Sequence, residues 1–165
     1  MPDSVRADIK SRIVALMVVA PACSILIVAV LYLLLRPLIP NSIAIHVGPD
    51  GVGYGSPLLL IAVASGIAAV VFAIGGATTR EFFKDGHWFQ TQKSIAVGVM
   101  ALGYGVIGVA LATILSNLNV DPEAISGNSV GMGLLGFIFL FIVAASVYVV
   151  LFPKAGIEPM NTSYR

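Results

Sequence analysis

The sequence predicts an all-α integral membrane protein, with residues 1–165 forming a single domain of four transmembrane helices packed as a bundle. One observation is composition: 58% of the 165 residues are hydrophobic and only 10% are charged, whereas soluble domains carry about 25% charged residues. The other is the placement of charge, because four stretches contain no Asp, Glu, Lys, Arg or His: 13–35, 58–78, 95–116 and 131–152. A soluble enzyme, a nucleic-acid-binding protein and a disordered protein are therefore excluded.

Each charge-free stretch is long enough to cross a bilayer as a helix, since about 20 residues at a rise of about 1.5 Å cover a hydrocarbon core of about 30 Å. Helices are favoured because lipid offers no partners to free backbone groups. The first stretch has 23 residues, more than the roughly 7–15 of a signal-peptide core. Within it we interpret Cys23 as a buried apolar residue rather than a lipidation site, and we expect Pro21 to bend the helix.

Lys and Arg residues predict the orientation, since short cytoplasmic segments are enriched in them. The outer side would have Arg36 alone, and the other connections and tails carry eight cations: Arg6, Lys10, Arg12, Arg80, Lys84, Lys93, Lys154 and Arg165. Both termini are therefore expected in the cytoplasm. The connections 36–57 and 117–130 would then face outward.

The residues of the four spans indicate helix packing rather than catalysis, ion transport or cofactor binding. The spans hold no ionisable residue of the kind that marks ion paths or proton relays, and no cofactor or metal is expected. Small residues four apart let helices approach closely, either within the chain or against membrane-protein partners. Such pairs are Ala101/Gly105 and Gly108/Ala112 in the third span, and Ala62/Gly66 and Ala64/Ala68 in the second.

The connection between the second and third spans mixes aromatic and basic side chains. This mixture is typical of the membrane interface, where rings lie at headgroup level and cations face the cytoplasm. We predict four interface anchors: Phe82, Phe83, Trp88 and Phe89.

The connection 36–57 is predicted to form a structured cap. Ile43, Ile45 and Val47 alternate with small or polar residues, the period of a half-buried strand. A tight turn follows at 48–51, with Pro second and Gly last. The candidate recognition residues of this loop are His46, Asp50, Gly51, Gly53, Tyr54 and Gly55.

His46 and Asp50 are close enough across the turn to hydrogen bond, so they serve either to lock the turn or to recognise a ligand. A metal site is disfavoured because one His and one Asp fall short of a usual ligand set.

The loop resembles the short membrane domain of SdpI-type immunity proteins, in which a Pro-containing segment ends in His and a Gly-rich, aromatic-containing turn follows. Residues 39–46 (IPNSIAIH) and 48–56 (GPDGVGYGS) carry this order, with Ala44 where the family usually has Pro. The match covers about residues 25–75. It implies a bacterial cell-membrane protein whose relatives protect the producing cell from a secreted membrane-active peptide and take part in signalling.

Two functions remain open at this stage. The first is a non-enzymatic, SdpI-like protein whose outer loop engages an extracytoplasmic peptide or other ligand. The second is an accessory subunit of a larger membrane complex, such as a transporter or respiratory assembly, joined through small-residue helix faces. An enzyme is disfavoured because the spans hold hydroxyl groups without an acid or base beside them.

Overall fold

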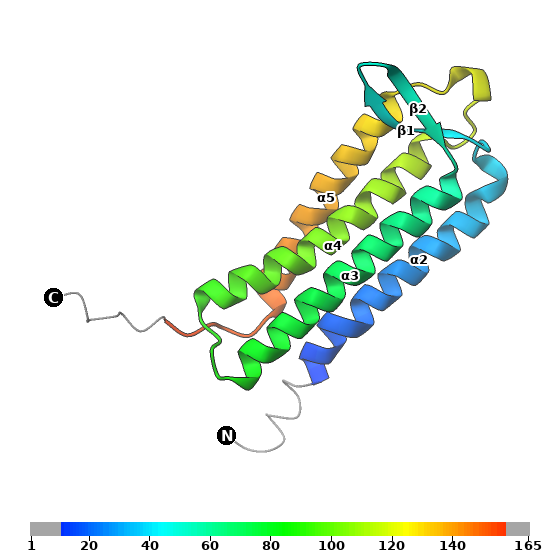
Figure 1. Cartoon of the computed structure of the whole chain (residues 1–165). Helices are drawn as coiled ribbons and strands as arrows, with labels where there is room; N and C mark the ends of the chain where they lie inside the picture. The colour runs from blue at the N-terminus through cyan, green and yellow to red at the C-terminus, as the bar shows by residue number, and fades with distance from the viewer. Residues whose placement is uncertain (1–10, 158–165) are drawn as a thin grey trace.

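Four long helices lie side by side in the structure, a computed structural model that describes residues 11–157 (Figure 1). Each is long and apolar enough to cross a membrane: Ser11–Leu38, Pro57–Lys84, Gln90–Ser116 and Asn128–Leu151. The first span consists of the π-helix η1 (Ala15–Val19), α2 (Ala20–Leu35) and the 3-10 turn η2 (Arg36–Leu38), and the others are α3 (Pro57–Lys84), α4 (Gln90–Ser116) and α5 (Asn128–Leu151). The prediction of four helices long and apolar enough to span a membrane is confirmed.

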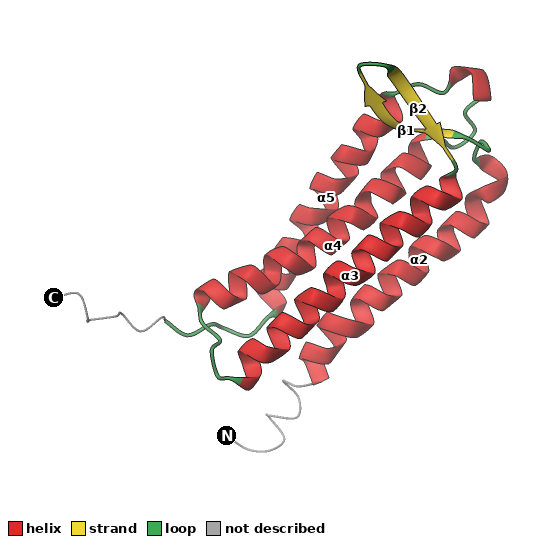
Figure 2. Cartoon of the chain, viewed as in Figure 1, coloured by secondary structure: helices red, strands yellow, loops and turns green. Residues whose placement is uncertain are grey.

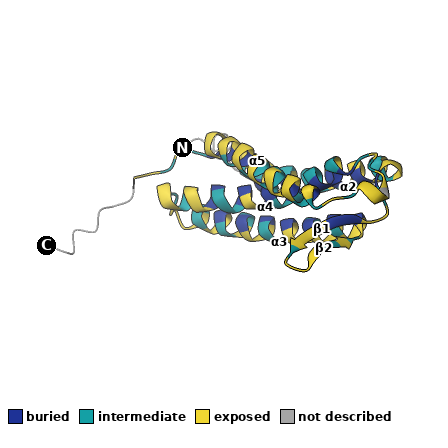
Figure 3. Cartoon of the chain, turned by 90° about the horizontal axis from the view of Figure 1, so that it is seen from above, coloured by how far each residue is buried: buried dark blue, intermediate teal, exposed yellow. Residues whose placement is uncertain are grey.

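The outward sides of the helices are apolar and exposed, whereas buried residues lie where helices face each other (Figure 3). Val150 is 78% exposed, Leu34 70% and Leu33 69%. Monomeric soluble proteins rarely expose large contiguous apolar surfaces, but a bilayer provides an apolar surrounding for them. The arrangement is that of a multi-pass membrane protein.

Two helices extend beyond the charge-free stretches. α3 continues through Arg80 to Lys84, and α4 begins at Gln90 rather than at residue 95. Charged side chains therefore lie on helical turns that were expected to be loop. A helix can continue past the hydrocarbon core because its backbone bonds remain internal while its charged side chains reach headgroups and water.

The helix α4 occupies the centre of the bundle. Half of its most apolar window is buried (50%), compared with 11–28% in the other three spans. It crosses α5 where Gly108 meets Gly136: a Cβ on either glycine would collide with the carbonyl oxygen of the other. Side chains are excluded here because the two backbones themselves are in contact.

The remaining small residues of the third span lie in the same region. A Cβ on Gly105 would come within 2.8 Å of the Phe137 ring, and one on Gly136 would collide with Ala112. Ala101 is fully buried. These residues therefore pack within the chain, and α5 supplies the matching glycines.

The small residues of α3 divide between two faces. Ala64 and Ala68 are buried in the bundle. Ala62 and Gly66 are exposed, and a Cβ added to Gly66 would have nothing within 4 Å. The two pairs were expected to act alike, but only one of them packs inside the chain.

In the first span, the backbone hydrogen bonds change from the α-helical to the π-helical pattern one turn before Pro21. In η1 the Ala20 N–H bonds to the carbonyl of Ala15, five residues back. In the same five-residue pattern, the carbonyl of Leu16 would accept from the N–H of residue 21, but residue 21 is proline, which has no N–H. The Tyr148 hydroxyl of α5 instead donates to Leu16 O at 2.6 Å. The turn that precedes Pro21 is thus a π-turn whose free carbonyl is bonded by another helix.

A two-stranded sheet, which follows the first span and precedes α3 in the chain, lies across the end of the bundle where α4 finishes and α5 begins (Figure 2). Its strands are β1 (Ile43–Gly48) and β2 (Gly51–Gly55). We call this the hairpin end. The described chain begins and finishes at the opposite, terminal end (Figure 1). Over the described residues the fold is thus a helical bundle with one β-hairpin, where the sequence predicted one strand, a tight turn and a compact cap.

Candidate functional site

The hairpin is antiparallel and carries one irregularity. The pairs run from Ile43 with Gly55 to Gly48 with Gly51, and the register shifts between Ala44 and His46. Ile45 is therefore the extra residue of a bulge, which changes the face to which the following side chains point. The tight turn at 48–51 is present, with Pro49 and Asp50 at its tip.

Three glycines of β2 are each required for a different structural reason. Gly51 has φ +108°, a conformation that L side chains rarely adopt. Gly53 lies directly under the His46 imidazole, which a Cβ would strike, and a Cβ on Gly55 would come within 2.7 Å of Ile45 Cδ1. The glycine-rich strand is therefore a surface on which two side chains of β1 rest, rather than a flexible tether.

The hairpin is fixed to the helix ends at several points. Ile43 and Ala44 are fully buried, and a Cβ on Gly127, next to the start of α5, would come within 2.7 Å of Val47 Cγ2. The Tyr54 hydroxyl lies 3.5 Å from the Ile125 carbonyl oxygen. The hairpin is therefore seated both on the bundle and on the connection between α4 and α5.

Hydrogen bonds close the base of the loop. Arg36 donates to Ile39 O at 3.0 Å and to Asn41 Oδ1 at 2.6 Å. The Asn119 N–H donates to Leu38 O at 2.8 Å, which joins the two connections of this end. The single cation of the loop is thus part of its internal structure.

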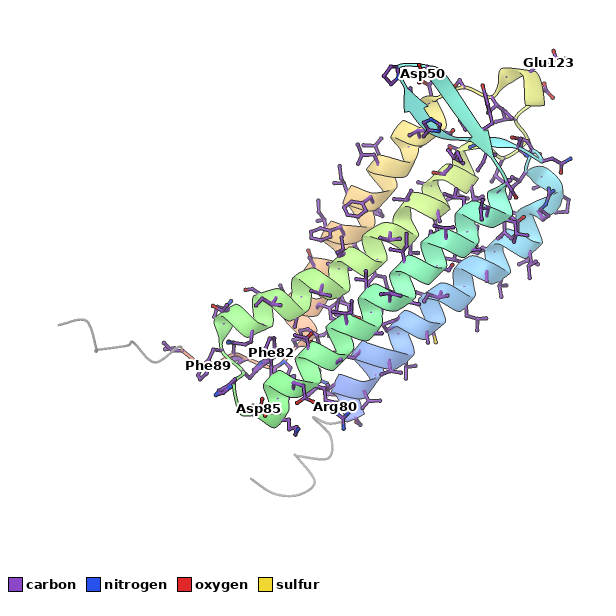
Figure 4. All side chains as sticks on the ribbon, in the orientation of Figure 1. Asp50, Arg80, Phe82, Asp85, Phe89 and Glu123 are labelled. Atoms are coloured by element: carbon purple, nitrogen blue, oxygen red, sulfur yellow. The ribbon has the colours of Figure 1, made fainter. Side chains whose placement is uncertain are left out.

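The outward surface of the hairpin combines apolar and polar side chains. Ile45, Tyr54 and Val47 are 42%, 54% and 57% exposed, which differs from the alternation expected in β1 because the bulge turns Ile45 outward. His46 and Asp50 are also exposed, and Asp50 lies at the hairpin tip, at the same end of the bundle as Glu123 (Figure 4). We call Ile45, His46, Val47, Asp50 and Tyr54 the hairpin surface.

The polar residues of this surface are available to a ligand. His46 and Asp50 do not hydrogen bond to each other, because the imidazole lies over Gly53 instead. Across residues 11–157, no group of three or more His, Cys, Asp or Glu is placed to hold a metal ion. The site can therefore offer hydrogen bonds, one carboxylate and apolar contact to a ligand.

The aromatic residues of the terminal end contact their own chain. Phe83 and Trp88 stack with centroids 4.1 Å apart, and Trp88 meets Phe152 edge-on at 5.7 Å. Trp88 Nε1 donates to Pro153 O at 3.2 Å, and Gly156 N donates to Trp88 O at 2.9 Å. The connection between α3 and α4 thus holds the segment that follows α5.

The other two expected anchors, Phe82 and Phe89, are half-buried at this end (Figure 4). Phe89 forms an isolated bridge with Gly156. The sequence missed the partner in this contact, the 152–156 segment, because it lies more than 60 residues away and has no distinctive motif.

Comparison with protein-family models, with curated proteins and with solved structures gives no match for this chain. The resemblance to the SdpI-type domain therefore rests on the loop residues themselves.

Proposed function

We propose that the chain is a non-enzymatic bacterial plasma-membrane protein whose hairpin surface recognises an extracytoplasmic peptide, in the manner of SdpI-type immunity and signalling proteins. The observation that carries the proposal is an ordered hairpin that exposes Ile45, Val47 and Tyr54 beside His46 and Asp50. Apolar groups of this kind usually mark an interaction surface when they are contiguous and rimmed by polar residues.

Charge placement supports the outward orientation and suggests the kind of peptide. Of the nine Lys and Arg residues, five lie at the terminal end (Arg12, Arg80, Lys84, Lys93 and Lys154), and Arg6, Lys10 and Arg165 belong to the two tails outside the described residues. This placement favours cytoplasmic termini. The hairpin-end segments carry Arg36 against Asp50, Asp121 and Glu123, a net charge of 1 − 3 = −2. A cationic, membrane-active peptide is therefore the favoured ligand.

The sheet edge offers a second form of contact. A two-stranded sheet has two outer edges whose backbone groups lack sheet partners. An extended peptide can pair with such an edge while alternate side chains contact the surface beside it.

Separate substitutions of His46 and Asp50 test the proposal. The full chain is expressed in a susceptible bacterium that is then exposed to secreted membrane-active peptides of positive, neutral and negative charge. We expect protection against the cationic peptides, reduced by His46→Ala and by Asp50→Asn. Asp85→Asn, which removes a carboxylate at the opposite, terminal end of the bundle (Figure 4), is the matched control and should keep protection. The proposal is wrong if correctly folded wild type gives no protection, or if both hairpin variants protect fully.

An accessory role in a larger membrane complex is the second candidate, favoured by the outward position of Ala62 and Gly66. Small residues on a lipid-facing side permit close approach of a partner helix. Purification in mild detergent tests this role: a stoichiometric partner lost on Gly66→Leu supports it, and a chain that purifies alone contradicts it.

A further inference from the structure

A groove runs between the first span and α3 at the terminal end. Its cavity volume is about 720 Å³, within the range of roughly 300–1,000 Å³ that is usual for small-molecule sites. One wall is formed by the first span, including Ile13, Met17 and Ile25, and the other by Ala69, Ala73 and Gly76 of α3. Four of the seven α3 residues that line the groove are small: Ala69, Ala73, Gly76 and Ala77.

The floor of the groove is a close helix contact. A Cβ on Gly76 would lie 3.6 Å from Met17 O, so the helices nearly touch at this level. Ala69, Ala73 and Ala77 are exposed beside it. An occupant would therefore lie along the seam between the helices, in contact with both.

The groove has the length of one bilayer leaflet. Its lining on the first span runs from Ile13 to Ile25 and on α3 from Ala69 to Phe83, about 18 Å and about 21 Å at a helical rise of about 1.5 Å per residue. Half of a hydrocarbon core of about 30 Å is about 15 Å. A partner transmembrane helix needs a surface along the full core, whereas an acyl chain needs one leaflet.

The end of the groove nearest the terminal end carries a positive charge. Arg80 lines this end together with Phe83, and its side chain lies between the last turns of α3 and the start of the first span (Figure 4). Arg80 is exposed and forms no ion pair with the residues that the structure describes. The neighbouring carboxylate Glu81 is instead paired with Lys84 at 3.4 Å.

We propose that this groove binds one anionic phospholipid from the leaflet at the terminal end. One acyl chain lies against the small residues of α3, and the phosphate-bearing headgroup is bound by the Arg80 guanidinium, whose planar donors match phosphate oxygens. The site is on the opposite end from the hairpin surface, so it is independent of the peptide-binding proposal.

The test measures lipid binding by the full chain in detergent with native mass spectrometry. The probes are phosphatidylglycerol and phosphatidylcholine with identical acyl chains. We expect one bound lipid and a preference for phosphatidylglycerol that Arg80→Gln lowers about fivefold. Lys84→Gln removes a cation one turn away that does not line the groove, and it should leave the preference unchanged.

A second pair of variants tests the acyl-chain position. Ala73→Leu fills the groove and should abolish tight binding of both lipids, with Ala69→Leu as a second filling variant if the first does not fold. Ala62→Leu makes the same substitution on an exposed part of α3 outside the groove and should bind as wild type does. The proposal is overturned if wild type binds the two lipids equally, or if the folded filling variants bind lipid as wild type does. It is also overturned if wild type forms a dimer that the filling variants dissociate.

Discussion

The hydrogen bond from Tyr148 to the Leu16 carbonyl is expected to stabilise the position of the first span. Tyr148→Phe removes only the hydroxyl group and keeps the ring that contacts Phe152 edge-on at 5.1 Å. The carbonyl then has no donor, because residue 21 is proline and the backbone is in the π register. An unpaired buried polar group costs about 1–3 kcal/mol, while interhelical hydrogen bonds in membranes average about 0.6 kcal/mol. We expect a loss of about 1–2 kcal/mol.

A double-mutant cycle with Pro21 tests the reasoning more sharply. Pro21→Ala restores an N–H five residues after Leu16, which can bond to the free carbonyl. In that background Tyr148→Phe should cost less than about 0.5 kcal/mol, a coupling of about 1 kcal/mol between residues on different helices. Tyr104→Phe is the control, since its hydroxyl is 3.4 Å from that of Tyr148 and bonds to no carbonyl in the described chain.

The free energy of unfolding is measured for each variant by reversible denaturation in mixed micelles. A Tyr148→Phe variant within about 0.3 kcal/mol of wild type would refute the importance of this bond, since even an average membrane hydrogen bond contributes about 0.6 kcal/mol. Equal costs of Tyr148→Phe with and without Pro21 would show that the proline does not leave the carbonyl unpaired.

Two further predictions follow from the helix contacts and the terminal end. Gly108→Ala should destabilise the chain by about 1–3 kcal/mol, because the added methyl group strikes the α5 backbone. Gly66→Ala should be neutral or stabilise the chain by up to about 1 kcal/mol, since its methyl group enters open space on a helix. The same denaturation assay measures both variants, and equal effects would contradict the placement of Gly108. Trp88→Phe keeps the aromatic stack but loses the hydrogen bond to Pro153, so proteolysis after residue 153 should become faster, and an unchanged cleavage rate would show that this bond does not hold the segment.

The sequence predicts the spans well because membrane crossing depends on a one-dimensional property, the absence of charge over about 20 residues. The sequence predicts the helix ends less well. Arg80 and Lys84 indicated a loop, yet α3 includes both residues. The reason is that charge marks the edge of the hydrocarbon core rather than the end of backbone hydrogen bonding.

The hairpin surface was predicted only in part. The turn and β1 have favourable residues, but β2 is rich in glycine, which is depleted in strands, so its pairing was not expected. The outward position of Ile45 depends on a bulge, at which the side chains of β1 lie over Gly53 and Gly55. Such contacts depend on the strand register, and the sequence pattern alone does not specify them.

The glycines of α5 that pack against α4 do have a local signal in the sequence. Gly133 and Gly136 are three residues apart rather than four, and both spacings lie on one side of a helix. The bond between Tyr148 and Leu16 joins residues 132 positions apart and has no local signal.

The π-turn of the first span also sets how far the helix before it is rotated, about the helix axis, relative to the helix after it. One extra residue in a turn rotates everything before it by about 100° relative to everything after it. The segment at Ser11–Val14 and the segment from Ala20 onward therefore present different stripes of the sequence to α3 and α5. Shortening this turn by one residue would restore a regular helix, but it would direct a different set of side chains, and a different carbonyl, toward Tyr148. The length of this turn is thus part of what orients the first span.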